Sequence, residues 1–250
     1  MIVGIIGLGE VGTAIRKLCK KKHRVYPRTR HIDELKGKTV DVLHLCYPYT
    51  DTFVQTAVEA IGELKPKLVI NDSSVKPGTT EEIYNQTEVP IVHAPIIGKH
   101  PGLYEYLFEL EKIIGAIDEK SYRAAKKHFE ELGLQTTRFK SPLEAEMAKL
   151  LSTTYYGWNI IYEKYVHRLC EQFGADFGQV YNRLNELYNR GYEHTLPHVR
   201  RPILKHVPGP IGGHCVIPNA KILNKWLADE LTTFLLVQNE KAKKDSKEEE

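Results

Sequence analysis

The sequence has no long apolar run, no disulfide framework and little net charge. None of its 250 residues belongs to an apolar run approaching the roughly 20 that a membrane span needs. The first residues also lack the basic n-region and the cleavage site of a signal peptide. The net charge of +3 gives no argument for nucleic acid or a membrane as a partner. The cysteines lack CxxC spacing, which excludes a disulfide framework and suits the reducing cytoplasm: Cys19, Cys46, Cys170 and Cys215. We therefore expect a cytoplasmic protein that binds a small molecule.

The composition is ordinary for a globular protein of one large or two smaller domains. Hydrophobic residues make up 42% of the chain and charged residues 27%, and this length allows a full-sized core. Residues 241–250 are almost all charged or small. We expect a frayed helix end or disorder there and assign this charged tail no function.

A glycine-rich turn opens the chain between an expected strand and an expected helix. The strand is Ile2–Ile6 and the helix is Thr13–Lys21, so a GxGxxG pattern stands in the strand–turn–helix setting of a dinucleotide site. Gly7 permits the turn, Gly9 lets the backbone approach a pyrophosphate, and Gly12 lets the helix pack on the strand. The cofactor-binding residues predicted here are Gly7, Leu8, Gly9, Glu10, Val11 and Gly12.

The second expected strand, His23–Tyr26, runs into a basic segment, Pro27-Arg28-Thr29-Arg30. An NAD site of this type usually has an acidic residue here for the ribose 2′-hydroxyl, whereas arginines suit a 2′-phosphate. The predicted cofactor is therefore NAD or NADP, with NADP favoured by Arg28, Thr29 and Arg30. The alternative is a solvated basic turn.

Strands and helices then alternate, which predicts a doubly wound parallel sheet of the Rossmann type. Ligands of such sheets bind beyond the carboxyl ends of the strands, so the loops that follow the strands are expected to share one rim. Four further residues on these loops are predicted to bind the cofactor: Cys46, Tyr47, Pro48 and Ser73. The expected strands are 40–46, 68–71, 89–93, 112–117 and 134–139, and the expected helices are 51–64 and 119–132.

The pattern changes at Ser141-Pro142. Residues 143–173 contain no proline and one glycine, and they predict a single helix of about 45 Å. A second helix is expected over 176–190, and a last one from Pro218 or Asn219 to about Glu240. The chain is thus predicted to form a Rossmann domain over 1–140 and an all-helical domain with one long helix over 141–240.

The most unusual segment is Pro208-Gly209-Pro210-Ile211-Gly212-Gly213-His214-Cys215. Its prolines fix φ and its glycines free it, so the backbone bends sharply and can be approached closely. A cysteine at the end of such a loop acts as a nucleophile where a cation or a helix N-terminus favours its thiolate. The alternative is a structural turn with a small buried thiol.

Four segments carry a resemblance to a known family. They are Gly7–Gly12, residues 72–80 (Asp-Ser-Ser-Val-Lys-Pro-Gly-Thr-Thr), residues 144–149 (Glu-Ala-Glu-Met-Ala-Lys) and residues 212–215 (Gly-Gly-His-Cys). In this order they resemble the UDP-glucose/GDP-mannose dehydrogenase family, over about residues 1–235. The His form of the cysteine loop is typical of the branch that acts on N-acetylhexosamine nucleotides. The resemblance implies a catalytic Lys149, a nucleophilic Cys215 and a homodimer formed along the 142–173 helix.

The sequence also departs from the family's pattern. Thr153 stands where the family has an asparagine, Ile96 where it has a glutamate that assists thioester hydrolysis, and Asn219 near an acid that follows the cysteine loop. The family's third domain, which binds the nucleotide sugar, is expected to be missing because the chain stops before it. Lys149 and Thr153 are at i and i+4 and share one helix face, while Ser74 is expected to bond the substrate hydroxyl or a catalytic water.

We therefore predict an NAD(P)-dependent dehydrogenase that oxidises a CH–OH group of a sugar nucleotide or of a smaller sugar-like alcohol. The catalytic residues predicted are Lys149, Cys215, Thr153 and Ser74. Because Ile96 cannot activate a water, the second, acid-forming step is expected to be impaired or absent, unless His93, His100 or His214 supplies the base. Two alternatives stand: a single-step dehydrogenase or reductase of the 3-hydroxyacid/6-phosphogluconate type, and a catalytically degenerate cofactor-binding protein.

No metal site is predicted. His194 and His198 have the i, i+4 spacing of helical metal ligands, and His206 and His214-Cys215 follow them. Pro197, however, argues against the regular helix that would bring the first two together.

Overall fold

The computed structural model describes residues 1–99 and 101–248, with side chains described through residue 244. The chain forms two compact units, Met1–Leu150 and Leu151–Glu250. This division falls within the long helix, ten residues after the boundary at residue 140 that the sequence predicts. Among the described residues, no helix is long and apolar enough to cross a membrane.

The first unit is built on a seven-stranded sheet in the order β2-β1-β3-β4-β5-β6-β7. All neighbouring strands are parallel except β5 and β6, which are antiparallel. The sequence therefore predicts the Rossmann-type sheet correctly but not its one reversed pair. Strands β5 and β6 are antiparallel because the connection between them begins and ends at the same end of the sheet. The strands are β1 (Ile2–Ile6), β2 (Arg24–Arg28), β3 (Val42–Leu45), β4 (Leu68–Asn71), β5 (Ile91–His93), β6 (Lys112–Ala116) and β7 (Thr136–Phe139).

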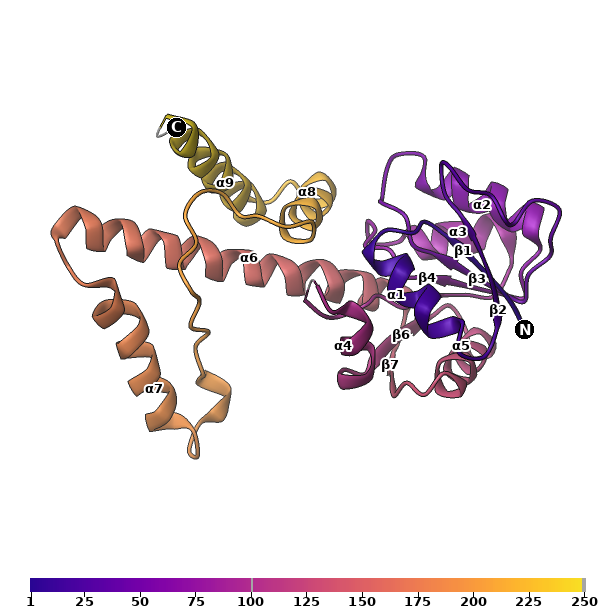
Figure 1. The fold of residues 1–250 in the computed structure, drawn as a ribbon, viewed down its shortest axis with the longest axis horizontal. Helices are drawn as coiled ribbons and strands as arrows, with labels where there is room; N and C mark the ends of the chain where they lie inside the picture. The colour runs from indigo at the N-terminus through magenta and orange to yellow at the C-terminus, as the bar shows by residue number, and fades with distance from the viewer. Residues whose placement is uncertain (100, 249–250) are drawn as a thin grey trace. The chain divides into compact units, whose positions relative to one another are not determined.

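Helices cover both faces of this sheet (Figure 1). Strand side chains alternate between two apolar cores, so that Val42 belongs to one core and Leu43 to the other. The core on Val42's face is closed by α1 (Glu10–Cys19), α4 (Leu103–Glu109) and α5 (Glu119–Glu131), and the other by α2 (Phe53–Leu64) and α3 (Thr79–Thr87).

The second unit contains helices and no strand in its described part. Its elements after the long helix α6 (Pro142–Phe173) are a π-helical turn (Gly178–Arg183), α7 (Leu184–Tyr192), a 3₁₀ turn (Pro197–Val199), α8 (Val216–Leu227) and α9 (Glu230–Glu248). Gly157 lets α8 and α9 approach α6, because a Cβ there would lie 2.6 Å from Val216 Cγ1 and 2.8 Å from Leu235 Cδ1. A small core around Ile211, Val216, Ala220 and Leu235 holds the three helices together.

Two expectations about helices are wrong in detail. Helix α1 begins at Glu10, three residues before the expected start, because the glycine turn feeds directly into it. The expected last helix is two helices, α8 and α9, separated at Ala228, whose φ of +52° ends α8 in the left-handed conformation. Lys65 and Glu88 end α2 and α3 in the same way. Residues 241–248 continue α9.

Candidate functional site

The loops expected to share one rim follow strand ends that lie at the same level. Ile6 is level with Arg28 and Leu45, Leu45 with Asn71, and Asn71 with His93. The loops after β1 to β5 therefore leave the sheet at one edge, which is where parallel α/β sheets bind their ligands.

The glycine turn at this rim has the conformation that a dinucleotide site requires. Gly7 has φ +93°, and a Cβ on it would lie 2.4 Å from the Cys46 carbonyl oxygen. A Cβ on Gly12 would lie 1.9 Å from the Gly7 carbonyl oxygen, so neither glycine can be replaced without moving the backbone. Gly9, in contrast, has no atom within 4 Å of the Cβ position, and as the N-cap of α1 it leaves the helix without a side-chain cap. The turn thus offers an open approach to the helix N-terminus, which fits a pyrophosphate.

The side chains of the other predicted residues of the turn differ in their exposure to solvent. Leu8 and Val11 are half-buried and pack against the core beneath α1, whereas Glu10 is exposed at the first position of the helix. We therefore expect the backbone rather than these side chains to contact a phosphate.

The basic segment after β2 is partly neutralised. The Arg28 guanidinium donates two hydrogen bonds to the Glu63 carboxylate, both 2.7 Å, and one of 2.9 Å to Asp33. These carboxylates raise the pKa of Arg28 and hold its side chain at the sheet edge. Thr29 Oγ1 accepts from the amides of His31 and Ile32, while Arg30 is exposed. The contacts of Arg28 and Thr29 thus belong to the turn itself and give no support to a preference for NADP.

The predicted residues after β3 and β4 are mainly parts of the framework. Ser73 Oγ donates to the carbonyls of Leu45 and Tyr47, at 3.1 and 2.7 Å, and so joins the two loops. Cys46 is buried, and Tyr47 stacks on Phe53 with 4.4 Å between ring centroids. Pro48 is exposed and Ser74 half-buried. Of this group, Pro48 and Ser74 present the more accessible side chains to the rim.

Lys149, near the start of α6, is held at the same edge by the chain after β5. Its Nζ donates a 2.8 Å hydrogen bond to the Ile96 carbonyl oxygen. The Ile96 side chain is 3% exposed and belongs to the core. This position therefore supplies a backbone acceptor for the lysine amine and no carboxylate.

Glu146, one turn before Lys149, fixes the start of α6 within the first unit. Its carboxylate accepts from the Gly78 amide at 2.6 Å and from the Thr80 amide at 2.8 Å, and so caps α3 from another element. Burial raises the pKa of Glu146 to about 7, against the pull of these amides. Sequence reasoning missed this role, although Glu146 lies inside the 144–149 motif, because its partners are 66 and 68 residues away in the chain.

The histidines considered for activating a water differ in their setting. His93 is fully buried, and burial lowers its pKa to about 3, so it is a neutral side chain of the core. His214 is exposed. His100 lies outside the described residues.

The cysteine loop belongs to the second unit. Cys215 is half-buried and occupies the N-cap of α8, the helix end that favours a thiolate. Gly213 has φ +79° just before it. In the same unit Asn219 Nδ2 donates a 3.0 Å hydrogen bond to Thr153 Oγ1, so two of the three positions that depart from the family's pattern are paired.

The histidines of the second unit do not gather as a metal site in the described part of the chain. His206 Nδ1 lies 2.8 Å from Glu163 Oε1, and the ring stacks on His167 at 3.6 Å between centroids. His194 lies in the turn after α7, and His198 lies in the 3₁₀ turn that begins at Pro197.

Comparison with known proteins gives curated relatives named UDP-N-acetyl-D-mannosamine dehydrogenase or NDP-N-acetyl-D-galactosaminuronic acid dehydrogenase. No protein-family model matches the chain. UDP-N-acetyl-D-mannosamine dehydrogenase of Methanocaldococcus jannaschii is 29% identical over 203 residues, which cover 73% of this chain and 44% of the relative. The enzyme of the same name from Pyrococcus horikoshii is 27% identical over 206 residues, covering 75% and 46%. The chain thus spans less than half the length of these curated relatives.

Solved structures show the same fold. UDP-D-ManNAc dehydrogenase from Pyrococcus horikoshii matches with a TM-score of 0.80 and 22% identity, over 97% of this chain and 69% of that one. A 3-hydroxyisobutyrate dehydrogenase from Mycobacterium tuberculosis matches with a TM-score of 0.69 and 15% identity, over 94% and 91%. The sequence relatives and the four motifs support the UDP-glucose/GDP-mannose dehydrogenase family for the part of it that this chain spans.

Proposed function

We propose that the protein is an NAD-dependent dehydrogenase that oxidises a CH–OH group of a sugar nucleotide or of a smaller sugar-like alcohol. The observation that carries the proposal is the open helix N-terminus at Gly9. The glycines on either side, Gly7 and Gly12, pack so closely that a Cβ on them would overlap backbone atoms. The relatives named UDP-N-acetyl-D-mannosamine dehydrogenase, together with the Gly-Gly-His-Cys loop, favour an N-acetylhexosamine nucleotide as the substrate class.

Oxidation of an alcohol removes a hydride from carbon and a proton from oxygen. A nicotinamide cofactor would supply the hydride acceptor, and the glycine turn and the rim loops would hold it. Lys149, in its free-base form, accepts the hydroxyl proton at Nζ. The Ile96 carbonyl limits the positions that this amine adopts, because it accepts one of its hydrogens. Ser74 orients the substrate hydroxyl from the neighbouring loop.

We propose NAD rather than NADP as the better cofactor. The Arg28 guanidinium is held by Glu63 and Asp33, and the Thr29 hydroxyl accepts bonds from its own turn. Two of the three residues that favour NADP in the sequence therefore have other partners. Arg30 remains as the exposed residue of the segment.

The second oxidation is proposed to be slow or absent. Attack of the Cys215 thiolate on the aldehyde and removal of a second hydride would leave a thioester, whose hydrolysis needs an activated water. Ile96 is buried at the position where a carboxylate would activate the water. Asn219 has an uncharged amide, which donates a hydrogen bond to Thr153. These substitutions equally favour the alternative, a single-step hydroxyacid-type dehydrogenase.

Replacing Gly9 with alanine tests cofactor binding without disturbing the free protein. The added Cβ meets no atom within 4 Å, so the melting temperature should not change. It does occupy the approach to the helix N-terminus, and we expect NADH to bind at least tenfold more weakly, a loss of about 1.4 kcal/mol. Gly62→Ala is the matched control, because Gly62 in α2 is also open. Equal NADH affinity in the Gly9→Ala variant and the wild type would contradict the proposal.

Product analysis separates one oxidation from two. Wild-type protein with NAD and UDP-N-acetylhexosamines should give at most one NADH per substrate and an aldehyde that a hydrazine reagent traps. Two NADH and a uronic acid would refute the impaired second step. Near-normal turnover by Cys215→Ala would favour the single-step alternative.

We further propose that α6 forms a homodimer interface. Several large side chains on this helix are exposed, among them Tyr155 and Tyr162, each at 61%, and Phe173 at 75%. Light scattering on the wild type and on Tyr162→Glu tests this: the variant should shift towards the mass of one chain.

A further inference from the structure

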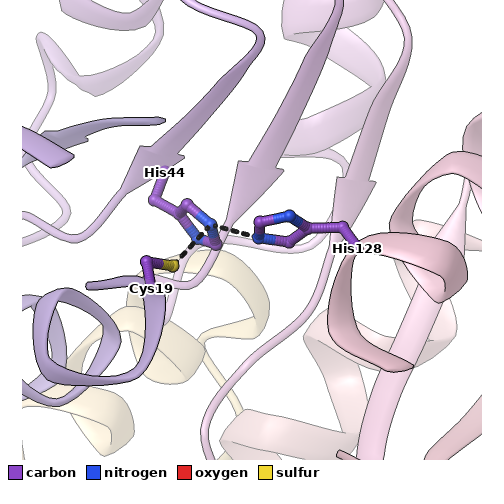
Figure 2. Close-up of side chains that lie close together, drawn as sticks. All are labelled: Cys19, His44 and His128. Carbon is purple, nitrogen blue, oxygen red and sulfur yellow. Dashed lines mark hydrogen bonds between the residues drawn. The ribbon is translucent and has the colours of Figure 1, made fainter. Parts of the chain in front are cut away.

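A cluster of buried histidine and cysteine side chains lies beneath the rim, within the first unit. Cys19 ends α1, His44 lies in β3 and His128 lies in α5, and all three are at most 2% exposed. Figure 2 shows the three side chains pointing toward one another from these elements. None of them has a part in the proposed oxidation.

The distances within the cluster are close to those of a metal site. The Nε2 atoms of His44 and His128 are 3.2 Å apart, and Cys19 Sγ is 4.0 Å from His44 Nε2. All three ligand atoms lie within 4.8 Å of one another. Tetrahedral Zn²⁺ places two nitrogens about 3.3 Å apart and sulfur and nitrogen about 3.6 Å apart. Cys19 Sγ and His44 Nε2 would therefore have to approach by about 0.4 Å, and Cys19 and His128 by up to about 1.2 Å.

Asp72 orients the first histidine as a metal ligand. Its Oδ2 lies 2.7 Å from His44 Nδ1, so Nδ1 carries the hydrogen and the lone pair of Nε2 faces the cluster. A carboxylate behind a histidine ligand in this way fixes its tautomer and raises its basicity. Lys112 Nζ, 2.9 Å from the other Asp72 oxygen, balances the carboxylate charge.

His128 is short of partners in the apolar interior. Its Nδ1 is buried without a hydrogen-bond partner among the described residues, and its ring faces His44 through Nε2. Buried polar atoms without partners are rare in native structures and call for an explanation such as an ion.

We propose that Cys19, His44 and His128 bind one Zn²⁺ ion in the core of the first unit. One thiolate and two imidazoles form a borderline-soft ligand set that suits Zn²⁺ better than Mg²⁺ or Ca²⁺. His23 is placed to complete the site after a side-chain rotation: its ring stacks on His128 at 5.5 Å, and both its nitrogens are buried without partners among the described residues. The ion would tie α1, β3 and α5 together as a structural site.

Cobalt serves as the probe, because thiolate–Co²⁺ complexes show a near-ultraviolet charge-transfer band and tetrahedral Co²⁺ absorbs in the visible. Full-length protein, reduced and stripped with a chelator, is titrated with Co²⁺ and then with Zn²⁺. We expect one Co²⁺ per chain, both spectral features, and displacement by Zn²⁺, which binds more tightly. Zn²⁺ should also raise the melting temperature of the stripped protein.

Variants locate the ion. Cys19→Ser should abolish the charge-transfer band, and His128→Asn should weaken Co²⁺ binding at least tenfold. Cys170→Ser is the matched control, because Cys170 is also buried but lies in the second unit, and its spectrum should match the wild type. A charge-transfer band that persists in Cys19→Ser would overturn the assignment.

X-ray absorption on the Zn²⁺-loaded wild type needs no variant to fold. It should show one sulfur at about 2.3 Å and nitrogen ligands at about 2.0–2.1 Å. Binding well below one ion per chain, or a Zn²⁺ shell without sulfur, would reduce the cluster to a hydrogen-bonded chain in which His128 donates to His44.

Discussion

Replacing Glu146 with glutamine should change how stability depends on pH. Glu146 is 1% exposed and accepts from the amides of Gly78 and Thr80 at the start of α3. Two effects oppose each other at this carboxyl. Burial, to which the nearby charge of Glu81 adds, favours the protonated form, whereas the amides favour the carboxylate.

Burial prevails and raises the pKa of Glu146 from 4.5 to about 7. The folded protein therefore keeps the proton at pH values where the unfolded chain has lost it. The resulting contribution to stability is complete below pH 4.5 and is lost as the pH rises through 7. At about 1.4 kcal/mol for each pKa unit, this loss is at most roughly 3 kcal/mol. A neutral glutamine, which resembles the protonated acid, does not undergo it.

The assay is urea unfolding at pH 5 and pH 8, followed by far-UV circular dichroism and by hydrogen exchange of the α3 amides. Tryptophan fluorescence does not report on this unit, since Trp158 and Trp226 both lie in the second. Relative to the wild type, Glu146→Gln should be more stable at pH 8 than at pH 5, by up to roughly 3 kcal/mol. Glu144→Gln is the control, because Glu144 is exposed on the same helix.

The opposite trend would refute the reasoning. If the wild type gains stability over Glu146→Gln as the pH rises, the two amides and the N-terminus of α3 outweigh burial, and Glu146 is a carboxylate at neutral pH. A pH-independent difference would mean that Glu146 does not change its protonation over this range.

Four further changes test separate features. Lys112→Met leaves Asp72 without its buried cation and should lower the free energy of unfolding in urea by about 3–5 kcal/mol. Its control, Lys67→Met, breaks an exposed pair with Asp41 and should lower it by less than about 1 kcal/mol. Gly12→Ala should cost at least about 1–3 kcal/mol and lower the melting temperature, because its Cβ overlaps the Gly7 carbonyl. Ala228→Gly should stabilise by roughly 1 kcal/mol, because it relieves a left-handed alanine; unchanged unfolding would contradict this. Arg28→Ala removes the bonds to Glu63 and should lower the melting temperature. In fluorescence titrations the ratio of NADH to NADPH affinity should stay unchanged. A fall in relative NADPH affinity would show that Arg28 binds the 2′-phosphate.

The sequence predicts those features that depend on neighbouring residues. The glycine turn could be predicted because Gly7, Gly9 and Gly12 fall between a strand and a helix, and the alternation of elements gives the sheet. The long helix follows from the absence of proline over residues 143–173. The break before α9 had a local signal that went unused: Asp229 accepts from the amides of Leu231 and Thr232 as a helix cap.

Features that join distant segments could not be predicted in this way. Glu146 caps a helix that begins 67 residues earlier at Thr79, and no spacing rule connects the two. Cys19, His44 and His128 form no metal-binding motif because they lie on three elements. The partners of Arg28 were also missed, since Glu63 lies 35 residues away in α2. Each of these contacts depends on which helices and strands become neighbours in the folded protein.

The capping of α3 by Glu146 sets an order of events during synthesis. Thr80 leaves the ribosome 66 residues before Glu146, which is roughly 3–13 s earlier at about 5–20 residues per second. For that interval the first-turn amides of α3 lack their carboxylate. The start of α3 therefore gains its cap only when the start of α6 emerges, and until then these amides are open to water or to a chaperone.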